Sequence, residues 1–343
     1  MRELKGYKMG VNLGGWYSQC DYSKDRLDNF IIEEDIARIS NWGFDHVRLP
    51  LDYNIVIKPD GTFIEDGFNR IGKVIKWCEK YGLNVVLDLH KTLGYSFDEG
   101  ENESGFFTSK EYQNVFYRFW DEMTDRFGKY EDMVMFELLN EVTDKEYLPS
   151  WINIYKTAIK RIREKLPTIK ILIGSYWYNS VWTVKDLEGP FDENIVLSFH
   201  CYDPQLFTHQ RAYWQKMMPD DFETEYPNKY GFLKDKSKEI YGNSEMFEGF
   251  DEEKNIGTEF FEHIFASAID TAEKFGTPLY CGEYGVIDKA DIDSTLRWYK
   301  DIHEVLRTHN IGHALWSYKE MDFGLTDKRM DSIREEIISS GKM

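Results

Sequence analysis

Residues 80–90 read KYGLNVVLDLH, a helix-like run that ends at a glycine and is followed by an apolar strand-like run. The same order recurs in NWGFDHVRLP (41–50), KFGTPLYCGE (274–283) and THNIGHALW (308–316). Gly or Asn in this position supplies the left-handed turn that ends a helix. Strands that are apolar throughout are typical of parallel strands packed on both faces. The pattern therefore predicts parallel strands, each preceded by a helix.

Eight such strands alternate strictly with helices, which predicts an α/β fold closed into a (β/α)₈ TIM barrel. An open doubly wound sheet is the competing interpretation, but it favours GxGxxG after the first strand, and the sequence there is NLGGW. The predicted strands are Met9–Leu13, His46–Leu49, Asn84–Leu89, Met133–Leu138, Ile171–Ile173, Ile195–Phe199, Leu279–Gly282 and Gly312–Trp316. The predicted helices are Glu33–Trp42, Asn69–Tyr81, Glu111–Phe127, Trp151–Lys165, Glu259–Phe275, Ile292–Thr308 and Asp331–Ile338.

One long segment interrupts this alternation after the sixth strand. Roughly fifty residues separate Phe199 from the next helix, far more than an ordinary βα loop contains. The segment is rich in aromatic and charged residues and has a helical pattern at Arg211–Met218. We therefore expect residues 1–343 to form a single catalytic domain, in which residues 203–257 are a small subdomain inserted after strand 6, over the active-site face.

The chain carries a net charge of −19, with a pI near 4.9, which makes nucleic acid and membrane surfaces poor partners. A neutral ligand fits better, and the 16% of aromatic residues suits a cleft in which sugar rings stack on flat side chains. The amino terminus has no apolar stretch of signal-peptide length. We expect a cytoplasmic monomer, or a secreted one if a leader had been removed.

Cysteine and histidine spacing gives no sign of a cofactor or metal. The four cysteines form no CxxC pair, and Cys78 and Cys281 lie in apolar runs typical of buried free thiols. No His, Asp or Glu cluster has the spacing of a metal site. We therefore expect no cofactor and no metal.

Polar residues stand at the carboxyl ends of the predicted strands, where barrel enzymes carry their catalytic groups. MVMFELLNEV (133–142) ends its strand in Asn140 and Glu141, and PLYCGEYGV (278–286) delivers Glu283. Glycoside hydrolysis needs two such carboxylates: one protonates the leaving oxygen and the other attacks the anomeric carbon. Either residue alone could be a solvated strand-end acid. The other strand-end candidates are Arg48, His90, His200, Tyr202 and Trp316.

The motifs FELLNEV, GEYGV, GFDHVRLP and VVLDLH resemble glycoside hydrolase family 5, the cellulase family of (β/α)₈ retaining enzymes. GVNLGGWYSQ, WCEKYGL, FTHQRAYW and YKEMDF are further similar to the clostridial endoglucanase C type within it, which carries a subdomain after the sixth strand. The resemblance extends from about Gly10 to about Phe323.

The resemblance implies roles for these residues. Glu141 would be the general acid/base and Glu283 the nucleophile, which Arg48 would hold ionised. Tyr202 would donate its hydroxyl to the nucleophile, and His200 would lie near the acid/base. Asn140 would hydrogen-bond the sugar 2-hydroxyl and His90 would bind other sugar hydroxyls. Trp316 would form the floor of the −1 subsite. Each also has a structural interpretation, as a rim ion pair, a rim histidine or a core tryptophan.

Acid/base catalysis requires the two carboxyl groups to differ at one pH. We expect Glu141 to lie in the drier surroundings and to have the raised pKa, whereas Arg48 and Tyr202 keep Glu283 charged. One departure from the family pattern is Lys91, because many cellulases in the family have a second histidine in its place. Lys91 would add a cation beside the sugar site.

The substrate stays open at this point. A retaining endo-β-1,4-glucanase acting on cellulose-like or mixed-linkage β-glucans is the first hypothesis. The alternatives are a β-mannanase or glucomannanase, an exo-acting β-glucosidase, and an inactive carbohydrate-binding barrel. The intact pair of glutamates argues against the last of these.

Overall fold

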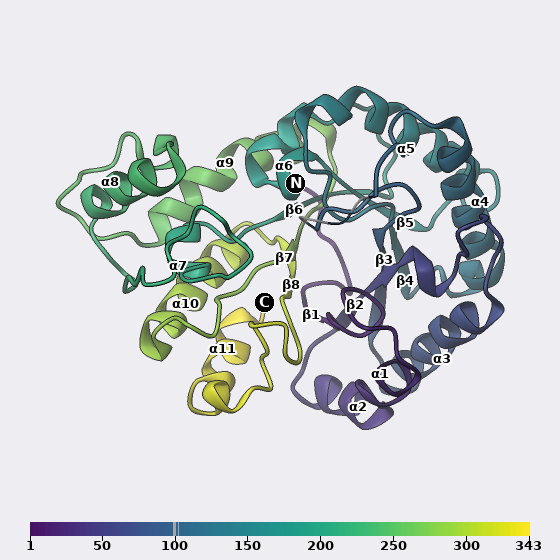
Figure 1. Ribbon diagram of the computed structural model, residues 1–343, viewed down its shortest axis with the longest axis horizontal. Helices are drawn as coiled ribbons and strands as arrows, with labels where there is room; N and C mark the ends of the chain where they lie inside the picture. Colours follow the sequence, from purple (N-terminus) through teal and green to yellow (C-terminus); the bar gives the residue numbers. More distant parts are fainter. Residues whose placement is uncertain (99–100, 102) are drawn as a thin grey trace.

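Eight parallel strands form a closed barrel in chain order in this computed structural model, which describes residues 1–98, 101 and 103–343 (Figure 1). The barrel closes where β1 pairs with β8, with Met9 opposite His313. The predicted fold class is thus confirmed. The strands are β1 Met9–Asn12, β2 His46–Asp52, β3 Asn84–Lys91, β4 Val134–Glu137, β5 Lys170–Gly174, β6 Ile195–His200, β7 Leu279–Glu283 and β8 Gly312–Leu315.

Helices surround the strands on the outside of the barrel (Figure 1). Their inner faces are apolar at helical spacing: α10, for example, buries Trp298, Ile302 and Leu306. The α-helices are α1 Lys24–Asn29, α2 Glu33–Asn41, α3 Glu65–Tyr81, α4 Lys110–Phe127, α5 Leu148–Arg163, α6 Tyr176–Asn179, α7 Gln205–Thr208, α8 Tyr230–Tyr241, α9 Thr258–Phe275, α10 Ile292–Thr308 and α11 Arg334–Gly341. Short 3₁₀ turns are η1 Tyr53–Ile55, η2 Gly128–Tyr130, η3 Lys145–Tyr147, η4 Val181–Asp186, η5 Glu245–Phe247 and η6 Lys328–Ser332.

The turns between helices and strands have the predicted backbone conformation. Gly82 and Gly276 follow α3 and α9 with φ of 70° and 66°, and Asn310 takes the same left-handed region after α10 with φ of 54°. In each case a strand begins within the next three residues. These positions favour Gly, which has no Cβ to clash at positive φ, and Asn, whose short polar side chain can hydrogen-bond to the nearby backbone.

The interior of the barrel changes character from its amino-terminal end to its carboxyl-terminal end. Side chains two residues apart on a strand share a face, and on β3 this series is Val86, Asp88 and His90. Val86 belongs to a buried apolar layer, made up of Leu4, Tyr7, Val86, Met135, Leu172, Val196, Tyr280 and Ala314. Above that layer, β1 to β4 bring Asn12, Arg48, Asp88 and Glu137 into contact, so polar chemistry is placed at the carboxyl-terminal end of the barrel.

The segment after β6 extends to one side, beyond α9 and α10 (Figure 1). It carries α7, α8 and η5. The predicted helical pattern at Arg211–Met218 is wrong: this stretch forms turns, and Arg211 has φ of 58°. Its apolar side chains do not form a buried stripe, since Tyr213 and Met217 are 79% and 58% exposed. That residues 203–257 fold as a separate subdomain stays a prediction.

Several element bounds also differ from the prediction. β2 continues to Asp52, three residues beyond the predicted end, and the C-terminal helix is divided into η6 and α11. The four cysteines are free thiols, and Cys78 and Cys281 are buried as expected. Within the described residues, we find no helix that combines the length and hydropathy needed to cross a bilayer.

Candidate active site

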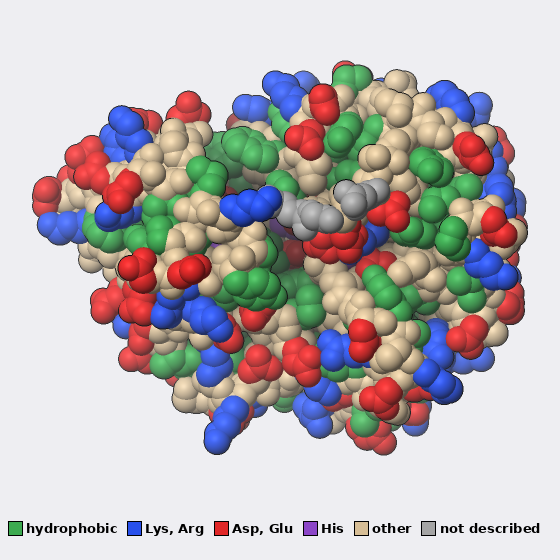
Figure 2. All heavy atoms as spheres, in the orientation of Figure 1, with side chains coloured by type: hydrophobic (Ala, Val, Ile, Leu, Met, Phe, Trp, Pro, Cys, Tyr) green, Lys and Arg blue, Asp and Glu red, His purple; other side chains and the backbone are tan. Residues whose placement is uncertain are grey.

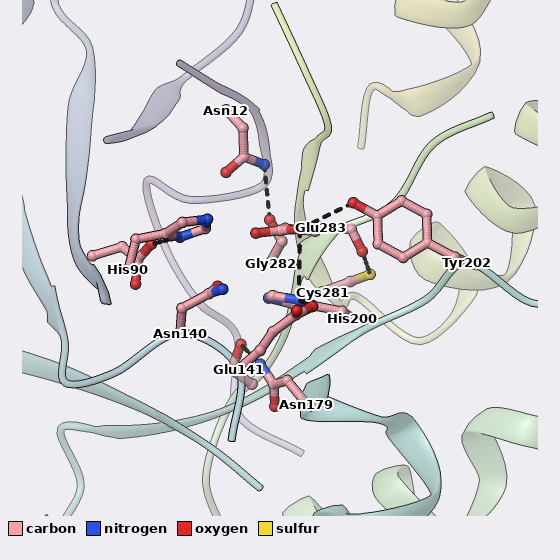
Figure 3. Close-up of polar contacts among 12 residues, drawn as sticks. Asn12, His90, Asn140, Glu141, Asn179, His200, Tyr202, Cys281, Gly282 and Glu283 are labelled. Carbon is pink, nitrogen blue, oxygen red and sulfur yellow. Dashed lines mark hydrogen bonds and ion pairs between the residues drawn. The ribbon is translucent and has the colours of Figure 1, made fainter. Parts of the chain in front are cut away.

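The carboxyl-terminal ends of the strands bring the predicted polar residues together. Figure 3 shows Asn140, Glu141, His200 and Glu283 converging from the chain after β4, the end of β6 and the end of β7. In the space-filling view this end of the barrel is hollowed (Figure 2). Strand ends far apart in sequence therefore build one site.

The two carboxylates face each other across this hollow. One oxygen of Glu141, one of Glu283 and one ring nitrogen of His200 all lie within 4.8 Å of one another. His200 Nδ1 is 2.7 Å from Glu141 Oε1 and 3.7 Å from Glu283 Oε2. Glu141 and Glu283 are only 9% and 5% exposed, so both act in a largely dry environment.

Glu283 has the surroundings of an ionised carboxylate. Arg48 Nη1 donates a hydrogen bond of 2.7 Å to its Oε1. The hydroxyl of Tyr202 donates one of 3.0 Å to its Oε2. Both donors favour the charged form of the acid. Both contacts are those that the resemblance implied.

Arg48 is fully buried on β2 and uses its whole guanidinium group. Its Nε and Nη2 bind both oxygens of Glu137, at 2.6 and 3.1 Å. Its Nη1 also donates to Asn12 Oδ1 at 2.9 Å. Its Nη2 donates to Asn140 Oδ1 at 2.6 Å and lies 3.0 Å from Asp88 Oδ2. The fixed fork of arginine donors thus orients several groups at once.

Two buried polar atoms point to a ligand. Asn140 Nδ2 and His200 Nε2 have no hydrogen-bond partner within the described part of the chain. A buried donor or acceptor without a partner costs about 1–3 kcal/mol, so such an atom calls for an explanation. Because Arg48 holds Asn140 by its oxygen, the amide NH₂ group is left available for a sugar hydroxyl.

His90 and Trp316 stack on each other beside this site. Their rings are parallel, with an interplanar angle of 4° and centroids 5.7 Å apart. His90 Nδ1 is 2.6 Å from Asp88 Oδ2, and its Nε2 is 3.3 Å from Gln19 Oε1. All eight residues selected from the sequence therefore line or border one site: Arg48, His90, Asn140, Glu141, His200, Tyr202, Glu283 and Trp316.

Burial and charge set the protonation of these groups. Burial, and then the charge of Glu283, raise the pKa of Glu141 well above its ordinary value. Burial also raises the pKa of Glu283, but the cation of Arg48 opposes it. Burial lowers the pKa of His200 well below its ordinary value, so this imidazole is neutral at neutral pH. The directions agree with the hypothesis that Glu141 is the more readily protonated acid.

Lys91 does not face the sugar site as a bare cation. Its side chain is only 5% exposed, and its Nζ lies 2.6 Å from Asp98 Oδ2 and 2.8 Å from Glu101 Oε1. The expectation of an added cation beside the sugar therefore needs revision, because two carboxylates from the following loop neutralise it.

Sequence reasoning missed several residues of this region. Asp88 and Glu137 stand at inward positions of β3 and β4, and charged residues inside otherwise apolar strands were the available signal. Asn12 bridges Arg48 to the backbone carbonyl of Gly282. Strand-end inspection could not reveal these contacts, because they depend on which strands are neighbours.

One three-residue group could bind a metal ion within the described residues. It consists of Glu141, His200 and Glu283, whose ligand atoms lie within 4.8 Å of one another. The sequence argument considered spacing along the chain and did not reveal this group, whose members come together only across the barrel. The same three groups are explained by acid/base chemistry, with Arg48 and Tyr202 already bound to Glu283.

A (β/α)₈ barrel with two buried carboxylates facing each other at its carboxyl-terminal end defines a glycoside hydrolase. Comparison with known proteins gives the family. The model described as Cellulase (glycosyl hydrolase family 5) matches residues 4–322. The chain therefore belongs to glycosyl hydrolase family 5.

Curated relatives cover nearly all of this chain. Cellodextrinase A of Ruminococcus flavefaciens is 50% identical over 311 residues, which is 91% of this chain and 85% of the relative. Endoglucanase C of Acetivibrio thermocellus is 37% identical over 342 residues, 98% of each protein. Among solved structures, endoglucanase Cel5A of Thermotoga maritima has a TM-score of 0.74 at 22% identity, covering 98% of this chain and 97% of that one, and shares the fold.

Proposed function

We propose that this chain is a retaining endo-β-1,4-glucanase that hydrolyses cellulose-like or mixed-linkage β-glucans by double displacement. The observation that carries the proposal is the carboxylate pair, with one oxygen of Glu141 and one of Glu283 within 4.8 Å. Inverting enzymes hold their carboxyl groups about 6.5–9.5 Å apart to admit a water, whereas retaining enzymes hold them about 5–5.5 Å apart. The short separation supports direct attack by one carboxylate.

In the first step, a Glu283 oxygen attacks the anomeric carbon while Glu141 gives its proton to the glycosidic oxygen. The bond between that carbon and oxygen breaks, the leaving chain departs with a free hydroxyl, and an ester joins the sugar to Glu283. Arg48 and Tyr202 support this step because their hydrogen bonds keep Glu283 ionised before attack.

In the second step, Glu141 is a carboxylate and takes a proton from a water that attacks the same anomeric carbon. The ester bond breaks, Glu283 regains its charge, and the product keeps the β configuration. His200, 2.7 Å from Glu141 and neutral, holds the acid/base in place without competing for charge.

The −1 subsite is completed by the neighbouring polar atoms. Asn140 would donate from its unpartnered amide to the sugar 2-hydroxyl, a contact that strengthens in the transition state. His90 would bind a further hydroxyl, and Trp316 would form the apolar floor.

The names of the relatives favour glucan over mannan. Endoglucanase C is named for internal cleavage of glucans, which supports endo action here. The higher identity to a cellodextrinase favours a second candidate, cleavage of short β-1,4-gluco-oligosaccharides. The two candidates share the same mechanism and differ in how much of a polymer the cleft accepts.

A substrate panel tests the proposal. Carboxymethylcellulose, lichenan, glucomannan and an aryl β-cellobioside are compared for reducing ends released and for loss of viscosity. Rapid viscosity loss on carboxymethylcellulose and lichenan is expected for endo action. Release of single glucose units alone would reject it. Proton NMR of the first product should show the β anomer, and an α anomer would reject the retaining mechanism.

We also propose that the enzyme acts as a monomer in the cytoplasm. Four free thiols support a reducing compartment. Sedimentation at micromolar concentration tests the monomer, and fractionation of the native host tests the location.

A further inference from the structure

Lys91, Asp98 and Glu101 form an ion-pair group, the Lys91 cluster, beside the site. Lys91 is the last residue of β3 and pairs in register with Asp52 of β2. Its ammonium group binds one oxygen of Asp98 and one of Glu101. Burial raises the pKa of the Asp52 carboxyl, and the positive charge of Lys91 is among the influences that oppose this rise. One cation therefore lies among three acids and binds two of them directly.

The second oxygen of Asp98 has a different partner. Asp98 Oδ1 accepts a hydrogen bond of 3.1 Å from Gln19 Nε2. The other end of the same amide lies 3.3 Å from His90 Nε2. Lys91 is thus connected to the sugar-site histidine through Asp98 and then Gln19.

The backbone conformation and the side-chain position of Gln19 are typical of a functional residue. It is a non-glycine residue with φ of 50°, a conformation that costs of order 1–3 kcal/mol. Its backbone N–H donates a 2.7 Å hydrogen bond to Asp52 Oδ2, which stabilises this conformation. Its side-chain amide is partly exposed beside His90. An amide offers both a donor and an acceptor, the chemistry that recognises a sugar hydroxyl.

We propose that Gln19 binds a hydroxyl of the glycone sugar, beside His90. Lys91 is then the positioning residue that orients Gln19 through Asp98. This inference rests on the proposed function. Lys91 takes no direct part in binding, because its ammonium is enclosed by Asp98 and Glu101. Without that cation, Asp52, Asp98 and Glu101 repel one another, and Asp98 no longer holds the amide of Gln19.

Phe97 strengthens the connection, because it lies in the same loop as Asp98. Its ring meets His90 edge to face, with centroids 4.9 Å apart. Tyr95, two residues earlier, donates from its hydroxyl to the backbone carbonyl of Glu141 at 2.5 Å. The loop that the Lys91 cluster holds therefore contacts both a sugar-binding residue and the acid/base.

A double-mutant cycle tests the inference. The full-length variants Lys91→Met, Gln19→Ala and the double variant are assayed on cellotetraose. Each single substitution should raise KM about 10-fold, with kcat within about 3-fold, as expected for the loss of one hydrogen bond to substrate. The double variant should be no worse than Gln19→Ala, because Lys91 acts through Gln19.

The control is Lys165→Met, which removes an exposed ion pair with Asp125 on the outside of the barrel. It should leave both constants unchanged. Should Lys91→Met fail to fold, Asp98→Asn replaces it, since this change weakens the same connection without removing the buried lysine.

The inference would be overturned by a wild-type KM in Lys91→Met. It would also be overturned by a KM about 100-fold above wild type in the double variant, because the two residues would then act independently. Failure of the proposed function has a different signature. If the proposed function is wrong, the wild-type enzyme cleaves another β-glycan and leaves cellotetraose intact. The same double-mutant cycle, repeated on that glycan, then tests the coupling of Lys91 to Gln19.

Discussion

Arg48 binds Glu137 through two nitrogens and Glu283 through a third, so that one guanidinium group links a strand-interior acid to the proposed nucleophile. Glu137 and Arg48 are completely buried. Burial raises the pKa of Glu137 to about 7, and Arg48 opposes that rise. The pair with Glu137 fixes the plane of the guanidinium, which determines where its remaining N–H groups point.

Replacement of Arg48 by lysine should therefore impair catalysis although the charge is kept. A single ammonium cannot bind Glu137 with two parallel hydrogen bonds and also reach Glu283 and Asn140. We expect kcat/KM to fall roughly 100- to 1000-fold, the range seen when one preorganised donor is lost from an active site. The acid limb of the pH–rate profile should move to higher pH, because burial then raises the pKa of Glu283 with less opposition.

Arg161→Lys is the matched control, since Arg161 forms an exposed ion pair with Asp121. It should behave as wild type. An unchanged acid limb in Arg48→Lys would show that this arginine does not set the ionisation of Glu283.

The two glutamates should differ in how their variants can be rescued. Glu283→Ala should be inactive on every substrate, because no group remains to form the ester. Glu141→Ala should lose activity on cellotetraose yet form the ester from 2,4-dinitrophenyl β-cellobioside, whose leaving group needs no proton. Added azide should then accelerate turnover and yield β-cellobiosyl azide, measurable by chromatography. Azide rescue of Glu283→Ala that yields the β-azide would reverse the two assignments, because the ester would then still form on another carboxylate.

Much of the site could be predicted because, in a barrel, a residue at the carboxyl end of any strand lies at the same end of the molecule. Polar residues at the carboxyl ends of apolar strands converge, whichever strands they belong to. Glu141 and Glu283 meet although 142 residues separate them, the difference of their numbers. The helix-ending glycines marked where strands begin, and Gly82 and Gly276 have the expected left-handed backbone.

What could not be predicted depends on contacts between strands and loops. The pairing of Arg48 with Glu137 requires knowing which inward positions of β2 and β4 lie at the same height in the barrel. Lys91 looked like an exposed cation because its neutralising partners come from a loop without a regular pattern. The turns at 211–218 looked helical because their apolar residues have helical spacing, although the aromatic side chains there are exposed.

The pH dependence of kcat/KM should be bell-shaped. Glu283 must be ionised, so activity is lost as pH falls through its pKa. Glu141 must be protonated, so activity is lost as pH rises through its pKa. Burial raises the pKa of both, and that of Glu141 is raised further, since the charge of Glu283 adds to burial there, whereas Arg48 is hydrogen-bonded to Glu283 and opposes the rise. The optimum should therefore lie above the ordinary carboxyl pKa of 4.5.

Glu141→Gln tests this assignment of the two limbs. On 2,4-dinitrophenyl β-cellobioside under single-turnover conditions, the variant should keep the acid limb and lose the alkaline one. The acid limb should stay near its wild-type position, because Glu141 is already protonated and neutral at the pH where Glu283 titrates. An alkaline limb that persists in this variant would assign it to another group.

Trp177 contacts the chain just after Glu141, the proposed acid/base, which would protonate the leaving group. Its backbone N–H donates a 3.0 Å hydrogen bond to the carbonyl of Thr143, two residues after Glu141. Its side chain is 57% exposed, and its φ of 57° begins three consecutive left-handed residues, 177–179. Hydrophobic side chains gather over α6, beside the hollow (Figure 2). Strained backbone of this kind is often kept where it positions a functional side chain.

Trp177→Ala should therefore weaken binding of the leaving glucose units and leave the chemistry of the −1 sugar intact. We expect kcat/KM for cellotetraose to fall about 3- to 10-fold, the contribution of one aromatic stacking contact. β-Cellobiosyl fluoride has no sugar in its leaving group, so its hydrolysis should be unchanged. Phe232→Ala, on α8 and 37% exposed, is the matched control and should affect neither substrate. If kcat/KM fell equally on both substrates, Trp177 would support the structure of the barrel and would not contact the leaving chain.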